Sequence, residues 1–119
     1  MNGALIFQWR ENIPGREAKS VEAFGKAISW FEQLTKQGKL HGHREYMSLT
    51  GGTGGFMLAE GDLTELKNLI DSDDAIRIST EAAASVSGFK ADVLVGGSDR
   101  DVQGLMNTYG ERMKELGYM

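Results

Sequence analysis

The sequence lacks several features that would point to a particular class of protein. It has no cysteine among its 119 residues, which excludes disulfides, a thiolate nucleophile and cysteine-ligated metal sites. It has no block of basic residues, and its net charge of −4 gives a nucleic-acid partner no electrostatic support. No apolar run approaches the roughly 20 residues that span a bilayer. The first twelve residues, MNGALIFQWREN, lack the basic start and the small-residue cleavage site of a signal peptide. We therefore expect a cytoplasmic protein without nucleic-acid or membrane partners.

The composition is typical of a single globular domain spanning residues 1–119, with 40% hydrophobic and 25% charged residues. The centre of the chain is the stretch from His41 to Asp62, HGHREYMSLTGGTGGFMLAEGD. It predicts a strand, a glycine-rich turn over 50–55, a second strand and the first residue of a helix. The second strand, 56–60, is apolar on both faces, so we expect it to be central and the histidine-bearing strand to lie nearer an edge.

The flanking segments predict the other strands and helices. Residues 3–10 are mostly apolar without alternation, which is typical of a strand covered on both faces. A helix is expected over 16–37, with Val21 in its apolar stripe and Trp30 at the rim of that stripe. Asp62 and Glu65 have capping-box spacing before a short helix, and the DSDD at 71–74 can cap a second helical piece. A strand over 89–97 then precedes a closing helix, which begins after Ser98. Its apolar stripe comprises Val102, Leu105, Met106, Tyr109, Met113 and Leu116.

This order of elements predicts a ferredoxin-like α+β fold, βαββαβ plus a C-terminal helix, with the helices on one face of the sheet. The other face would then have no cover within the chain, although the first and third strands carry apolar residues on both sides. A monomer would expose a large hydrophobic patch. Pairing two sheets face to face removes this conflict, so we expect a homodimer with a two-fold axis.

The stretch from Ile28 to Gly96 resembles the dimeric α+β barrel superfamily and, within it, the YCII-like proteins. The residues that carry the resemblance are ISWFEQLTKQGKL, GGFMLAEGDLTELKNLIDSD and GFKADVLV. The resemblance implies a dimeric α+β barrel. YCII-like proteins carry a histidine on the first helix and an aspartate before a Pro-Phe pair. Here Ala27 stands in place of the histidine, and Asp73 is followed by Asp74 and Ala75. The resemblance therefore implies no histidine–aspartate chemistry for this chain.

The same superfamily contains cofactor-independent monooxygenases, lactone isomerases and haem-degrading enzymes. The haem-degrading members combine an asparagine near the first strand with a tryptophan and a helix-borne histidine. Both histidines of this chain lie on the expected second strand, and Trp30 lies on the first helix. The chain therefore does not match the residue pattern of the haem-degrading members, and we expect no cofactor.

The sharpest local feature is the triplet His41, His43 and Glu45. Alternation along a strand places the three side chains on one face, and two imidazoles with a carboxylate form a recognised metal-ligand set. Such residues are about 6.6–7 Å apart along a strand, so they converge on one ion only if the strand curves. The alternative is that they are solvated residues of an edge strand.

The turn TGGTGG over 50–55 lacks the Gly-Lys-Ser/Thr ending of a phosphate-binding loop, and a strand follows it, so we interpret it as a hairpin turn. A small-molecule pocket is expected between sheet and helices, or inside the dimer barrel. The candidate lining residues are Gln8, Trp9, Arg10, Arg44 and Tyr46. The two arginines would favour an anionic or carbonyl-bearing ligand. Dimer contacts or solvent exposure are the alternative roles of these residues.

Three hypotheses for function remain open. The first is a homodimeric α+β barrel that binds a small organic molecule or acts structurally. The second is an enzyme of the cofactor-independent oxygenase or isomerase type, with His43 or Tyr46 as the proton-transfer group. The third is a metal site at His41, His43 and Glu45. An enzyme requires a cavity into which His43 or Tyr46 points, and this geometry distinguishes the hypotheses.

Overall fold

The computed structural model describes residues 1–51 and 54–119. Two residues of the predicted turn, Gly52 and Thr53, lie outside the described residues. The elements are β1 (Asn2–Trp9), α1 (Glu17–Lys36), β2 (Gly42–Met47), β3 (Gly55–Asp62), α2 (Leu63–Ile70), α3 (Asp73–Ser85), β4 (Lys90–Val95) and α4 (Asp99–Glu115). The predicted order of elements is confirmed, including the division of the second helical region into two pieces.

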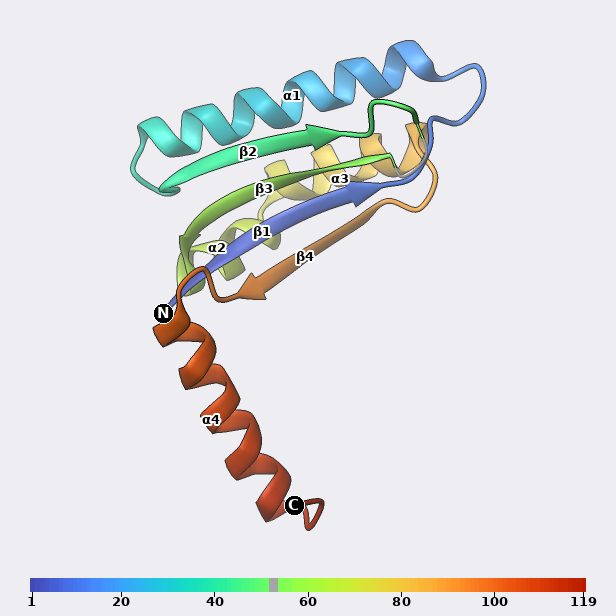
Figure 1. Ribbon diagram of the computed structural model, residues 1–119. Helices are drawn as coiled ribbons and strands as arrows, with labels where there is room; N and C mark the ends of the chain where they lie inside the picture. The colour runs from blue at the N-terminus through green and yellow to red at the C-terminus, as the bar shows by residue number, and fades with distance from the viewer. Residues whose placement is uncertain (52–53) are drawn as a thin grey trace.

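The four strands form one antiparallel sheet in the order β2-β3-β1-β4 (Figure 1). The apolar strand β3 is central and the histidine-bearing strand β2 is at an edge, as the sequence predicts. Helices α1, α2 and α3 pack on one face of this sheet. This arrangement is the ferredoxin-like α+β fold.

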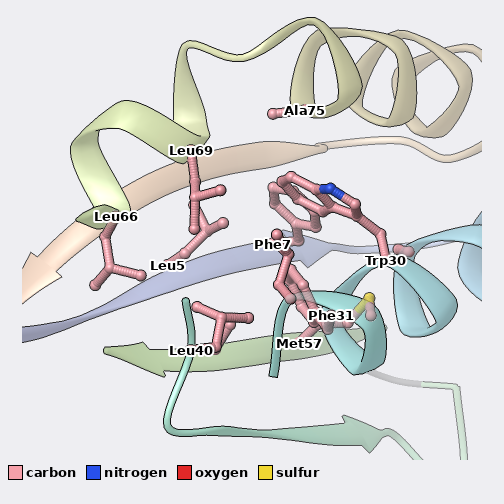
Figure 2. Packing of buried hydrophobic residues seen from close by; sticks show 12 residues of the cluster. Leu5, Phe7, Trp30, Phe31, Leu40, Met57, Leu66, Leu69 and Ala75 are labelled. Carbon is pink, nitrogen blue, oxygen red and sulfur yellow. The ribbon is translucent and has the colours of Figure 1, made fainter. Parts of the chain in front are cut away.

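The hydrophobic core lies between the helices and one face of the sheet. Alternate residues of β1 and β3 point into it, among them Leu5, Phe7 and Met57, which are at most 2% exposed. Figure 2 shows how Leu66 and Leu69 of α2 meet these strand residues from the opposite side. Burial of these large side chains is the main source of stability of the fold.

Two predictions about α1 are wrong. Trp30 belongs to the core: it is 8% exposed, and its ring is stacked on that of Phe7 with centroids 6.5 Å apart (Figure 2). Val21, predicted in the apolar stripe, is 71% exposed. The stripe is shifted because α3 packs beside α1 and covers the Trp30 side of the helix, while Val21 lies in the first turns of α1, at the wall of a cavity that is described below.

The predicted helix ends are confirmed by their hydrogen bonds. The Asp62 carboxylate accepts a bond from the Glu65 N–H at 3.3 Å, and the Ser72 hydroxyl accepts one from the Ala75 N–H at 3.3 Å. Gly38 follows α1 with φ of 77°, the left-handed conformation that glycine adopts at helix ends. These bonds satisfy backbone groups that the helices leave without partners. No helix in the described part of the chain is long and apolar enough to cross a membrane.

The second face of the sheet, which we call the open face, carries no helix. Apolar residues extend across it from β3 to the edge strand β4 and comprise Ala4, Ile6, Phe56, Leu58 and Leu94. Its polar residues are Gln8, Arg44, Tyr46, Glu60, Lys90 and Asp92. Helix α4 extends away from the sheet and leaves this face uncovered (Figure 1).

Candidate functional site

A cavity of about 560 Å³ lies on the helix side of the sheet, at the end where β1 and β2 finish. Helices α1 and α3 form its other walls. Four aromatic residues line it, namely Phe7, Trp9, Phe24 and Phe89, and the Trp9 and Phe24 rings meet edge to face with centroids 5.7 Å apart. Aliphatic side chains such as Met57, Ile78 and Val86 complete the lining. An apolar cavity of this size with few polar groups is typical of a small-molecule site.

The polar residues of the cavity come from several segments: Arg10, Glu11 and Asn12 from the chain that leaves β1, Ser20 from the beginning of α1, Ser48 from the end of β2 and Ser85 from the end of α3. Asn12 and Ser20 are joined by a hydrogen bond in which the Ser20 hydroxyl donates to the Asn12 amide oxygen at 2.6 Å. Arg10 also lines the cavity, and its side chain lies over Gly88, where an added Cβ would be 3.0 Å from the Arg10 Cγ. Across residues 1–51 and 54–119 the Arg10 guanidinium has no ion-pair partner. It can therefore bind an anionic or carbonyl oxygen at the rim.

The glycine-rich turn has a structural role beside this cavity. Gly54 adopts φ of 71°, and a Cβ at this position would lie 2.2 Å from the Trp9 carbonyl oxygen and 2.3 Å from that of Arg10. Only glycine permits such a close approach of two backbone segments. The turn thereby fixes the end of β1, from which Trp9 and Arg10 reach the cavity. The hairpin interpretation agrees with this geometry.

A second hollow lies at the same end of the sheet, on the open face. Gln8, Tyr46, Phe56 and Lys90 line it, together with Trp9 and Arg10. The candidate ligand-binding residues are thus divided between the two faces. Trp9 and Arg10 reach both hollows, whereas Gln8 and Tyr46 reach only the one on the open face. Arg44 lines neither hollow.

Arg44 is instead paired with Glu60 across β2 and β3 on the open face. The hydrogen bond and the charge of the Glu60 carboxylate raise the pKa of the Arg44 guanidinium above its usual value. Because this guanidinium already has a carboxylate partner, it is less available for a ligand than that of Arg10.

His43 and Glu45 lie on the helix side of the sheet and contact each other through the imidazole Nδ1 and a carboxylate oxygen. The imidazole is half-buried, with its centroid 5.9 Å from that of the Phe31 ring, and it lines neither hollow. His41, at the start of the strand, is exposed. In the described part of the chain no group of three or more histidine, cysteine, aspartate or glutamate side chains could hold a metal ion. The structure therefore joins only two of the three candidate metal ligands.

Sequence reasoning did not identify several residues of the cavity, among them Asn12, Ser20, Phe24 and Phe89. Phe24 and Phe89 resemble ordinary core residues in the sequence, because the periodicity of a helix does not distinguish the wall of a cavity from a filled core. Asn12 and Ser20 belong to the turn before α1 and to its first turns. Only the chain connection that brings them over the end of the sheet shows their role.

Comparisons with known proteins support the fold. A scan against protein-family models and a search of curated proteins found no match. Among solved structures, the chain is similar to a dimeric ferredoxin-like protein of unknown function from Jannaschia sp. CCS1. The TM-score is 0.61 and the identity 13%, over 79% of this chain and 98% of that one. A dimeric protein of unknown function with a ferredoxin-like fold from Bacteroides fragilis gives a TM-score of 0.55 at 9% identity, over 77% and 93%.

A third similar structure is SnoaB, a cofactor-independent oxygenase from Streptomyces nogalater. The TM-score is 0.58 and the identity 10%, over 82% of this chain and 94% of that one. At such low identity these likenesses concern the backbone architecture and transfer no activity. The chain therefore has the ferredoxin-like α+β architecture of these proteins.

Proposed function

We propose that the protein is a homodimeric α+β barrel that binds a small organic molecule in the cavity beside Trp9. The observation that carries the proposal is the cavity itself, about 560 Å³ in volume, with aromatic walls and polar residues that include Arg10, Asn12 and Ser20. Apolar walls supply affinity by removing ligand surface from water, and a few polar groups at one end fix the orientation of the ligand.

The lining favours a flat, largely apolar ligand that carries an anionic or carbonyl group. The rings of Phe7, Trp9 and Phe24 offer faces and edges against which a planar molecule can pack. The Arg10 guanidinium, which has no ion-pair partner in the part of the chain that the structure describes, can bind the oxygen of such a group. The linked Asn12 and Ser20 side chains can exchange further hydrogen bonds.

The homodimer is supported by the open face and by the similar structures. Five apolar residues lie on that face, four of them on the central strands β1 and β3, and polar side chains such as Arg44, Glu60 and Lys90 lie beside them. This is the usual anatomy of a protein interface. Two of the similar structures are described as dimeric ferredoxin-like proteins. Two sheets facing each other across a two-fold axis would bury both open faces.

The enzymatic and metal alternatives have less support from the geometry. His43 lines neither hollow, so it would not reach a ligand in the cavity, and Tyr46 reaches only the hollow on the open face. The fold is shared with a cofactor-independent oxygenase, but a fold does not determine a reaction. The finer resemblance to YCII-like proteins adds no chemistry, because Ala27 replaces the helix histidine.

The experiment that tests ligand binding uses anilinonaphthalene sulfonate, an aromatic anion whose fluorescence rises in apolar sites. We expect saturable binding and quenching of tryptophan emission, because Trp9 lines the cavity. In the variant Ala82→Phe, a bulky ring on α3 fills the cavity and should weaken binding by about tenfold or more, equivalent to about 1.4 kcal/mol.

Ala83→Phe is the matched control, because Ala83 is the next residue of α3, is exposed and does not line the cavity. Its affinity should stay within about twofold of the unmodified protein. If both variants bind the dye equally well, the dye binds elsewhere and the cavity proposal is wrong. If the unmodified protein binds no dye and carries no extra mass in a native mass spectrum, the structural alternative replaces the proposal.

A further inference from the structure

Helix α4 differs from the other three helices because none of its 17 residues is buried. Its predicted apolar stripe is real, but five of the six side chains are 41 to 56% exposed: Val102, Leu105, Met106, Tyr109 and Leu116. In Figure 1 the helix extends away from the sheet, and only its beginning lies near β1 and β4. An amphipathic helix with a solvated apolar stripe lacks the partner for which its sequence is suited.

The beginning of α4 is fixed to its own domain, so its direction is determined. The Asn2 N–H donates to the Asp101 carboxylate at 3.3 Å, and the Ser98 hydroxyl caps the helix by accepting a bond from the Asp101 N–H at 3.2 Å. Val102 packs against Gly96: a Cβ added at Gly96 would lie 3.3 Å from the Val102 Cγ2. Beyond this anchor the rest of the helix projects from the edge of the domain (Figure 1).

A helix in this position is not expected to be stable without a partner. Isolated helices shorter than about 12 to 15 residues are marginal in water even when they are rich in alanine, and α4, with 17 residues, is only slightly longer and is not rich in alanine. α4 contains Gly104 and Gly110, and glycine inside a helix lowers its stability. Among residues 1–51 and 54–119 no atom comes within 4 Å of a Cβ built at Gly110, so no contact in this part of the chain explains that glycine.

The chain as a whole is less compact than an ordinary monomer of its size. The accessible surface is 7860 Å², against about 6,300 Å² for a compact monomer of this mass. The radius of gyration is 16.3 Å, against about 13.5 Å for a compact chain of this length. The surplus of about 1,500 Å² exceeds the ~800 Å² that each partner buries in a standard interface. A partner of similar size can therefore cover both α4 and the open face.

We infer that α4 is an exchanged arm, whose apolar stripe packs against a second copy of this chain beside the open face of the partner sheet. Each chain has two uncovered apolar surfaces, the stripe of α4 and the open face. A two-fold axis allows the α4 helix of each chain to pack against the other subunit. The stripe itself contains no charged residue, as expected for the centre of an interface between copies. This inference rests on the proposed homodimer, but a dimer formed through the open faces does not require the exchanged arm.

The first test is amide hydrogen exchange of the full chain at protein concentrations above and below dimer dissociation. In the dimer we expect the amides of residues 103–115 to exchange at least about 100-fold more slowly than in the monomer, because docking stabilises the helix. If α4 is unprotected in the dimer, the exchanged arm is wrong and the open-face dimer stands. If α4 is equally protected in the monomer, it packs on its own domain, and the inference is overturned.

The second test compares two substitutions on α4 by sedimentation equilibrium. Tyr109→Glu places a carboxylate in the stripe and should raise the dimer dissociation constant by about tenfold or more. Asn107→Glu adds the same charge on the opposite side of the helix and should change the dissociation constant by less than about twofold. Equal effects of the two variants would overturn the inference. A full chain that is monomeric at every concentration would overturn both the arm and the proposed dimer.

Discussion

The two faces of the sheet are built from the same strands, yet they differ in how they are covered. On the helix side, Leu5, Phe7 and Ala59 are at most 1% exposed. On the open face, Phe56 and Leu94 are 38 and 42% exposed, although they alternate with core residues along β3 and β4. An apolar strand without alternation therefore serves two purposes here: one side forms the core of the chain, and the other is available for a second subunit.

The difference between the faces also separates the candidate functions. The aromatic cavity lies on the helix side, where the chain supplies all its walls. The hollow that contains Gln8 and Tyr46 lies on the open face, so a dimer would change its shape or close it. Trp9 and Arg10 lie at the end of β1 and reach both sides. Ligand binding in the cavity and dimer formation can therefore influence each other through this end of the sheet.

The largest effect is expected for Phe7→Ala on the covered face. Its ring packs against Trp30, Phe31 and Phe89, with centroids 5.5 to 6.5 Å apart, so truncation leaves a void in the core. We expect the free energy of unfolding to fall by about 3–5 kcal/mol in urea denaturation. The adjacent substitution Ile6→Ala on the open face should cost about 1 kcal/mol in the dilute monomer, because Ile6 is only half-buried. Equal losses would show that the two faces are equivalent.

The second-largest effect is a weakening of dimer formation, and it is expected for Leu58→Glu on the open face. A carboxylate there would be desolvated in a dimer, so the dissociation constant should rise at least about 30-fold, equivalent to about 2 kcal/mol. The monomer should stay folded, because Leu58 is only half-buried and Arg44 lies beside it on β2. Sedimentation equilibrium measures the change.

The matched control for Leu58→Glu is Ile76→Glu. Ile76 is an aliphatic residue of α3 that is 55% exposed and lies away from the open face. Its substitution introduces the same charge and should leave association within about twofold of the unmodified protein. A dimer that tolerates Leu58→Glu as well as Ile76→Glu would use another surface, and the proposed pairing of sheets would have to be abandoned.

Much of the fold could be predicted from the sequence, because its signals are local. The pair Asp62 and Glu65 predicts the start of α2, and the DSDD segment predicts the break before α3. The apolar composition of 56–60 predicts that β3 is central. Such signals depend on hydrogen bonds and side-chain alternation within a few residues, and the neighbouring sequence contains them in full.

The depth of burial and the site could be predicted only in part, because they depend on contacts between distant segments. From the sequence, Trp30 was predicted to be a rim residue, but it is buried because α3 packs beside α1. The sequence does not show that these two helices are neighbours. His43 looked available for chemistry, yet its ring packs against Phe31. Trp9 and Arg10 were identified as ligand-binding candidates, but nothing in the sequence joined them to Asn12 and Ser20. Periodicity identifies the face of an element, and only tertiary structure identifies its neighbour.

The smallest effect is expected at two helix caps of the same type, one on α3, which packs on the sheet, and one on α4, which extends away from it. Ser72 caps α3 by accepting the Ala75 N–H at 3.3 Å, and Ser98 caps α4 by accepting the Asp101 N–H at 3.2 Å. Ser72→Ala should lower the free energy of unfolding by about 1 kcal/mol, because α3 folds together with the core. It should leave the dimer dissociation constant unchanged, since α3 lies on the covered side.

Ser98→Ala removes an equivalent bond from a helix that contributes no buried residue to the core. Its effect on unfolding of the monomer in urea should therefore be much smaller, below about 0.5 kcal/mol, whereas amide exchange in α4 should accelerate. In the dimer, the same substitution should also weaken association, because an arm that docks must first be helical. If Ser98→Ala destabilises the monomer as much as Ser72→Ala does, then α4 unfolds together with the core. Helix α4 and the core would then form one cooperative unit within a single chain.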